Sequence, residues 1–134
     1  MKFTLQLPLL LLVLAGCTGK NDTDPGTYRL FDTNWLFYPG DLEAGANPET
    51  DDSGWRKLDL PHDWSIENIP GTDSPFDSTV ENGVSSGFTR GGTGWYRKHF
   101  RIDPNDKGKR VRVLFEGIYM NSDIWLNGNH VGSY

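Results

Sequence analysis

Residues 94–102 read GWYRKHFRI, and this stretch decides the class of the fold. Tyr96, Phe100 and Ile102 fall on one face of an extended chain, and mostly charged side chains fall on the other. Alternation with a period of two is typical of a half-buried β-strand. The polar segment 103–108, which contains Pro and Gly, follows as a turn. We therefore expect a strand over 94–102 that ends at a turn.

Short aromatic and β-branched runs lie on both sides of this strand, separated by Gly, Pro, Asn and Asp. They predict further strands at 34–38, 55–60, 110–115 and 122–126. The pair Asn127-Gly128 predicts a type I′ hairpin turn after the last of these. Few residues follow the turn, and native domains usually cover an open sheet edge. We therefore expect an all-β domain and suspect that the chain is the N-terminal part of something longer.

The composition limits the class of protein. The chain has 134 residues, 13 Lys and Arg against 18 Asp and Glu, and a formal net charge of −5. That length is too short for a complete catalytic barrel of about 250 residues. The acidic balance argues against a nucleic-acid partner, since such proteins usually carry a basic patch. Aromatic residues make up 13% of the chain, which favours a packed domain over disorder.

The first residues have the pattern of an export signal. Lys2 precedes the largely apolar stretch 5–14, which is shorter than the ~20 apolar residues that a membrane-spanning helix needs. Residues 14–17 read LAGC, and this resembles the lipobox of bacterial lipoproteins. The resemblance implies lipidation at Cys17, the only cysteine of the chain. The alternative is an unmodified thiol at the end of an ordinary signal peptide.

These patterns divide the chain into three parts. We expect a lipoprotein signal peptide at 1–16, a lipidated cysteine and flexible tether at 17–27, and a folded domain at 28–134. The lipid would place the protein outside the cytoplasm, anchored to the bacterial membrane on the periplasmic or surface face of the outer membrane.

Three segments carry a resemblance to a known family. They read LPHDW at 60–64, GGTGWYRK at 91–98 and FEGIYMNSDIWLNGNHVG at 115–132. In this order they resemble the N-terminal sugar-binding domain of glycoside hydrolase family 2, nearest to the β-galactosidases of gut-type Bacteroidetes. The resemblance implies a jelly-roll β-sandwich similar to galactose-binding domains, of which this chain would hold an incomplete copy. It also implies an immunoglobulin-like domain and a catalytic barrel beyond these residues.

The resemblance implies a retaining hydrolase as the parent protein, acting on terminal β-galactosides of a glycan. In such enzymes two glutamates about 5–5.5 Å apart act as nucleophile and acid/base. The glutamates of this chain lack the surroundings of those catalytic motifs; they are Glu43, Glu49, Glu67, Glu81 and Glu116. We expect no catalytic residue and no cofactor here. We also expect no metal site, because His62, His99 and His130 show no ligand spacing.

The segment 69–93 is long, polar and rich in glycine, as functional loops often are. In the resembling enzymes the loop before Gly-x-Tyr reaches toward the catalytic pocket, and an Asn there helps to hold the substrate in some members. That position is Gly91 here, so the Asn role does not carry over. Phe88 and Arg90 are the large side chains left to shape a substrate pocket. The alternative is packing between domains.

Five further residues are candidates for contact with a sugar or with a neighbouring domain: His62, Asp63, Trp95, Asp123 and Trp125. An exposed aromatic ring can stack on the apolar face of a sugar. The alternative for the tryptophans is burial in the core or at a domain interface, and for Asp63 it is hydrogen bonding to local amides.

Three functions therefore remain open from the sequence. The chain could be the scaffolding N-terminal part of a lipid-anchored β-galactosidase-like enzyme. It could also be a stand-alone carbohydrate-binding lipoprotein, or an inactive truncated product.

Overall fold

The computed structural model describes residues 28–81, 83–119 and 121–134. The predicted signal peptide at 1–16, the tether at 17–27 and Cys17 lie outside the described residues. Within the described part the fold is all-β, with two short 3₁₀ turns and no longer helix. No helix of this part is long and apolar enough to cross a membrane.

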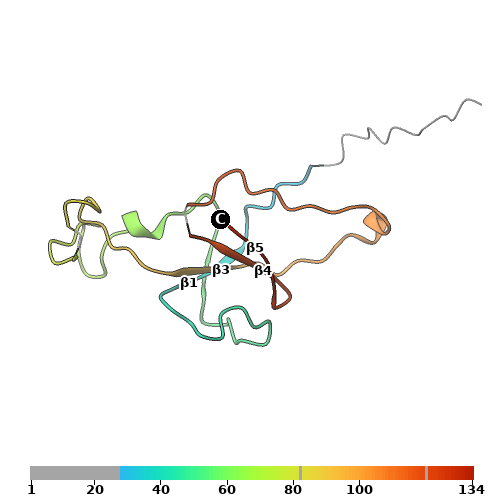
Figure 1. Cartoon of the computed structure of the whole chain (residues 1–134), viewed down its shortest axis with the longest axis horizontal. Coiled ribbons are helices and arrows are strands. Elements are labelled where there is room, and N and C mark those ends of the chain that lie inside the picture. The colour runs from blue at the N-terminus through green and yellow to red at the C-terminus, as the bar shows by residue number, and fades with distance from the viewer. Residues whose placement is uncertain (1–27, 82, 120) are drawn as a thin grey trace, which may run out of the picture.

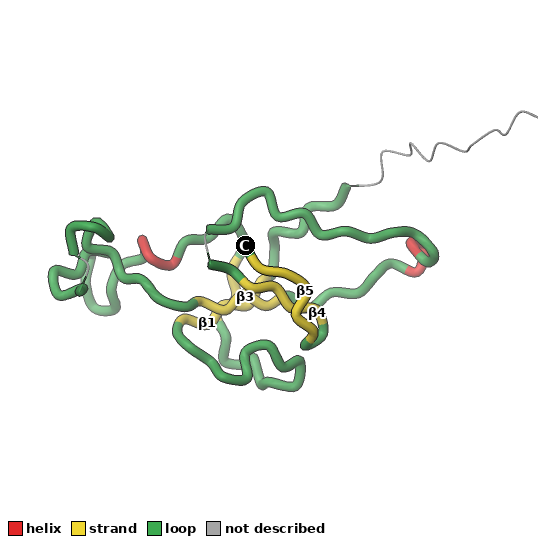
Figure 2. The backbone as a smooth tube through the Cα atoms, in the orientation of Figure 1, coloured by secondary structure: helices red, strands yellow, loops and turns green. Residues whose placement is uncertain are grey.

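The strands gather at the centre of the molecule (Figure 1). A long loop over 69–93 extends to one side of them, and the segment 98–116 extends to the other. Figure 2 shows that most of the remaining chain is loop. The elements in chain order are β1 (Trp35–Pro39), β2 (Arg56–Leu58), η1 (Trp64–Ile66), β3 (Gly94–Arg97), η2 (Pro104–Asp106), β4 (Asp123–Leu126) and β5 (Asn129–Ser133).

The strands form two antiparallel groups. β1 is the middle strand of a three-stranded sheet in the order β2-β1-β3, and β4 pairs with β5 as a hairpin. Phe37 of β1 lies opposite Tyr96 of β3 and opposite Arg56 of β2. The predicted turn is confirmed, because Asn127 and Gly128 have φ values of 50° and 79°, both in the left-handed region.

The core lies under β1. Its side chains alternate, so that Trp35 and Phe37 are buried on one face of the sheet. Trp55, just before β2, is buried as well. Phe37 is the most buried of these residues, with 2% of its surface exposed.

One predicted strand is too long, and another is absent from the structure. β3 ends at Arg97, so 98–102 is not a strand, and 110–115 forms no strand either. Ile102, Val111 and Val113 are exposed in these segments. The period of two predicts which face of a strand is apolar, but a strand also needs a hydrogen-bonding neighbour. No described segment supplies one here.

Candidate functional site

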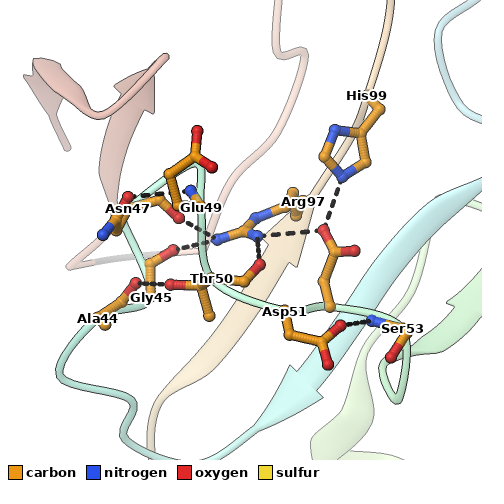
Figure 3. A network of polar contacts seen from close by, with 10 residues as sticks. Ala44, Gly45, Asn47, Glu49, Thr50, Asp51, Ser53, Arg97 and His99 are labelled. Carbon is orange, nitrogen blue, oxygen red and sulfur yellow. Dashed lines mark hydrogen bonds and ion pairs between the residues drawn. The ribbon is translucent and has the colours of Figure 1, made fainter.

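Arg97 of β3 holds the loop that joins β1 to β2 (Figure 3). Its Nη2 donates to the backbone oxygens of Gly45 at 2.8 Å and Asn47 at 3.0 Å. Its Nη1 donates to the Thr50 oxygen at 2.9 Å and pairs with Asp52 Oδ2 at 3.1 Å. The guanidinium also lies 4.7 Å from the centre of the Trp55 ring, and only 13% of the side chain is exposed. One part-buried cation therefore ties β3 to a loop whose own hydrogen bonds form only short turns.

Asp52 connects this network to His99. Its Oδ2 lies 2.6 Å from His99 Nε2 and also receives Arg97. Burial would raise the pKa of Asp52, but the hydrogen bonds and charges of His99 and Arg97 outweigh burial and hold that pKa below its ordinary value. The Asp52 carboxylate is therefore ionised at neutral pH and binds both the Arg97 guanidinium and the His99 ring.

The lowered pKa of Asp52 predicts a loss of stability in acid. Because the folded pKa lies below the unfolded one, the stabilisation is present above the ordinary value of 3.8 and is lost as the pH falls below it. Asp52→Asn should therefore flatten the fall of the melting temperature below about pH 4. Melting curves between pH 3 and 7 test this, with the exposed Asp41→Asn as control. An unchanged acid limb in Asp52→Asn would contradict it.

The predicted residues His62 and Asp63 both form hydrogen bonds with other residues of the chain. His62 Nδ1 lies 2.7 Å from the Tyr96 hydroxyl, and its Nε2 lies 2.8 Å from Glu67 Oε1. Asp63 caps η1, because its Oδ1 accepts from Ser65 N at 2.9 Å. Burial, with the nearby Asp63 and Glu67 charges, raises the pKa of Tyr96 to about 12, so this hydroxyl keeps its proton. For Asp63 this contact is the hydrogen bonding to a local amide given above as its alternative, and contact of either residue with a sugar stays a prediction.

Of the predicted residues, Trp95 and Trp125 lie where the two strand groups meet, and Asp123 lies on the β4–β5 hairpin. The Trp95 and Trp125 rings are 5.4 Å apart between centres. Asp123 Oδ1 accepts from Ser133 Oγ at 2.6 Å and faces His130 Nε2 at 3.0 Å. Hydrogen bonds from Ser133 and then His130 hold the pKa of Asp123 below its ordinary range.

Ser133, His130 and Asp123 have the residue types of a hydrolytic triad, but their geometry differs. The same nitrogen, His130 Nε2, faces Ser133 Oγ at 3.1 Å and Asp123. In a triad the two ring nitrogens serve the serine and the carboxylate separately. The cluster therefore fastens the β4–β5 hairpin and lacks the triad arrangement, in which one ring nitrogen takes the serine proton while the carboxylate holds the other.

The predicted residues Phe88, Arg90 and Gly91 lie together on the loop 69–93. Its two limbs meet where Phe76 bridges Thr89 and where Asp77 N donates to Phe88 O at 2.7 Å. Beside this crossing is a hollow of about 390 Å³, lined by Val80, Glu81, Ser86, Thr89, Gly91 and Gly92. Phe88 is 40% exposed. The loop therefore has internal structure and an open concave side.

Sequence reasoning missed Asp77, which pairs with Arg90 across this loop. Oδ2 of Asp77 lies 3.0 Å from both Nε and Nη2 of Arg90. Hydrogen bonds from Thr79 and then Arg90 lower the pKa of Asp77, so it is ionised at neutral pH. The sequence signal that could have found Asp77 is its Asp-x-Thr spacing, which is typical of a turn capped by a side chain.

The predicted site residues fall into three groups: His62 with Asp63, Trp95 with Asp123 and Trp125, and Phe88 with Arg90 and Gly91. No hydrogen bond or ring contact among the described residues joins one group to another. In the part of the chain that the structure describes, no cluster of three His, Cys, Asp or Glu could hold a metal ion. The loop group is the one that borders a hollow.

The all-β fold and the three motifs match the N-terminal region of glycoside hydrolase family 2 proteins. The chain is 40% identical over 119 residues to β-galactosidase BoGH2A of Bacteroides ovatus, which covers 89% of this chain. It is 30% identical over 112 residues to a β-glucuronidase of Formosa agariphila, covering 79% of this chain.

A solved structure agrees with this match. The crystal structure of a glycosyl hydrolase family 2 member from Bacteroides cellulosilyticus is 58% identical, with a TM-score of 0.72 over 78% of this chain. The chain spans only 13% of the length of the Bacteroides ovatus relative and 10% of the Formosa agariphila relative. No protein-family model matches the chain.

Proposed function

We propose that this chain is the non-catalytic N-terminal part of a lipid-anchored family 2 glycoside hydrolase that removes terminal β-galactosyl residues from glycans. The observation that carries the proposal is the 40% identity to a β-galactosidase over 89% of the chain. Catalysis by retention would use two glutamates on residues that these 134 do not include. The role of this part is to scaffold the enzyme and to shape one side of its substrate pocket.

The architecture proposed for this part is a jelly-roll β-sandwich. Its support is that the fold has two antiparallel strand groups and that one ring contact, Trp95 with Trp125, joins them. The loop 69–93 would form the pocket wall, because its residue Gly91 borders a hollow. Phe88 and Arg90 would be its contacts to the sugar, because both side chains are exposed on the same loop.

The lipid anchor at Cys17 belongs to the same proposal, supported by the LAGC sequence. It would hold the exported enzyme at the outer membrane of the bacterium, on the periplasmic or surface face. Two or more acyl chains give stable anchoring, whereas one gives only marginal binding.

One experiment tests the enzyme and its anchor together. The whole reading frame that begins at Met1 is expressed in a Bacteroidetes host as wild type and as Cys17→Ser. We expect hydrolysis of nitrophenyl β-galactoside in the membrane fraction of the wild type. In Cys17→Ser the activity of the membrane fraction should be at least about tenfold lower. Absence of hydrolysis overturns the proposed activity. Equal membrane activity in both strains overturns the anchor alone.

A further inference from the structure

Asp77 and Arg90 form an ion pair in which the loop holds the Asp77 carboxylate in place. Oδ1 of Asp77 accepts from Thr79 N at 3.0 Å and from Thr79 Oγ1 at 2.5 Å. The backbone N–H of Asp77 donates to Phe88 O at 2.7 Å. Oδ2 is left to receive Nε and Nη2 of Arg90, both at 3.0 Å. The carboxylate is therefore held in place and orients the guanidinium.

Arg90 keeps hydrogen-bond donors for a ligand. A guanidinium has five N–H donors, and Asp77 occupies one side of it. The Nη1 atom makes no hydrogen bond to a described residue, and 47% of the side chain is exposed. The Arg90 N–H groups that face away from Asp77 can therefore bond a ligand, while the Asp77 carboxylate balances the positive charge of the guanidinium.

The neighbouring Phe88 is strained and open. Its φ is 62°, and a bulky residue in the left-handed region is an outlier that often marks a functional position. A Cβ added at Gly83 would lie 2.8 Å from its ring, so the ring rests on that glycine while 40% of the residue stays exposed. An exposed ring of this kind can stack on the C–H face of a sugar.

The hollow on this loop, lined by the neighbours of Arg90 in sequence, Thr89 and Gly91, and not by Arg90 or Phe88 themselves, has the size of a small ligand site. Its volume of about 390 Å³ lies within the range of roughly 300–1,000 Å³ found for such sites. Thr89, Gly91 and Gly92 line it from the limb that carries Arg90. A stacking ring, oriented donors and an open hollow thus occur together on one loop.

We propose that the Asp77–Arg90 pair makes this loop selective for neutral β-hexosides over β-uronides, an inference that rests on the proposed function. An ion-paired guanidinium donates to sugar hydroxyls without much net charge. A uronate carboxylate that approached Arg90 would also meet the Asp77 carboxylate, and the two like charges repel. The pair would thus separate two substrate classes that occur among the similar proteins.

The test compares Asp77→Asn with Arg90→Gln in the enzyme translated from the whole reading frame. Asparagine keeps an oxygen for Thr79, so the turn is retained while the charge is lost. The measured quantity is the ratio of kcat/KM for nitrophenyl β-galactoside to that for nitrophenyl β-glucuronide. Asp77→Asn should lower this ratio about fivefold, the scale of one half-exposed charge pair. Arg90→Gln should raise it, because Asp77 then repels the uronide without compensation.

The matched control is Asp73→Asn, which removes an exposed charge on the same loop that makes no hydrogen bond or ion pair with a described residue. It should leave the ratio within about twofold of the wild type. Loss of loop structure would shift both test variants in the same direction, and that result overturns the inference. So does an unchanged ratio in Asp77→Asn.

Failure of the proposed function gives a different result. If the wild type hydrolyses neither glycoside, that function is overturned, and selectivity is then measured as dissociation constants of methyl β-galactoside and methyl β-glucuronide by NMR titration. The same opposite shifts in the two variants are expected there. Binding of neither sugar, or shifts of the same sign, overturns the inference as well.

Discussion

Arg97→Ala should lower the free energy of unfolding of this chain by about 3 kcal/mol, because it removes a part-buried guanidinium that donates to four acceptors. The substitution removes the donor to the backbone oxygens of Gly45, Asn47 and Thr50. It also leaves Asp52 with His99 as its remaining side-chain partner. A buried acceptor without a donor is costly, and Gly45 is buried, so this part of the loop would have to open to water. Urea unfolding followed by tryptophan fluorescence measures the loss.

Two controls separate the network from a general effect of charge. Arg97→Lys keeps the charge but loses the planar fork that serves several acceptors, so we expect an intermediate loss of about 1–2 kcal/mol. Arg101→Ala removes an exposed arginine from the segment that follows β3 and should change stability by less than about 0.5 kcal/mol. Equal losses in Arg97→Ala and Arg101→Ala would contradict the role of the network.

The sequence predicted where Arg97 lies but not what it contacts. The period of two placed it on a strand, and β3 contains it. Its acceptors lie 45–52 residues earlier, in a segment that showed only turn residues. Local patterns report the face and the turns of a chain, whereas a loop fixed by one distant side chain leaves no periodic signal. The same reason explains why the strands at 98–102 and 110–115 were predicted without partners.

The candidate site was predictable to a similar degree. The length and polarity of 69–93 indicated a functional loop, and Phe88, Arg90 and Gly91 are on it. The partner of Arg90 was not predicted, because Asp77 is 13 residues away across a crossing of two irregular limbs. The left-handed backbone of Phe88 also has no signal in its residue type, since phenylalanine rarely adopts it.

Phe37→Ala should have the largest effect of all, a loss of about 4 kcal/mol in the free energy of unfolding. Phe37 is 2% exposed, and its ring centre lies 5.0 Å from that of His62 and 4.9 Å from that of Tyr96. The Arg56 guanidinium lies 5.1 Å from the same ring. The middle strand of the sheet thus places one ring among side chains of β2, β3 and the segment before η1. Alanine leaves a cavity that these rigid aromatic neighbours can fill only in part.

Phe37→Leu is the graded comparison, because it keeps most of the apolar volume and should lose less than half as much stability as Phe37→Ala. Phe76→Ala is the matched control, since that ring is 62% exposed and its removal should cost less than about 1 kcal/mol. Urea unfolding of the three variants beside the wild type gives the comparison. A loss in Phe37→Ala no larger than that in Phe76→Ala would mean that the sheet is held by contacts other than this core. The contacts of His62 would then need another explanation, because its ring packs on Phe37 as well as bonding to Tyr96.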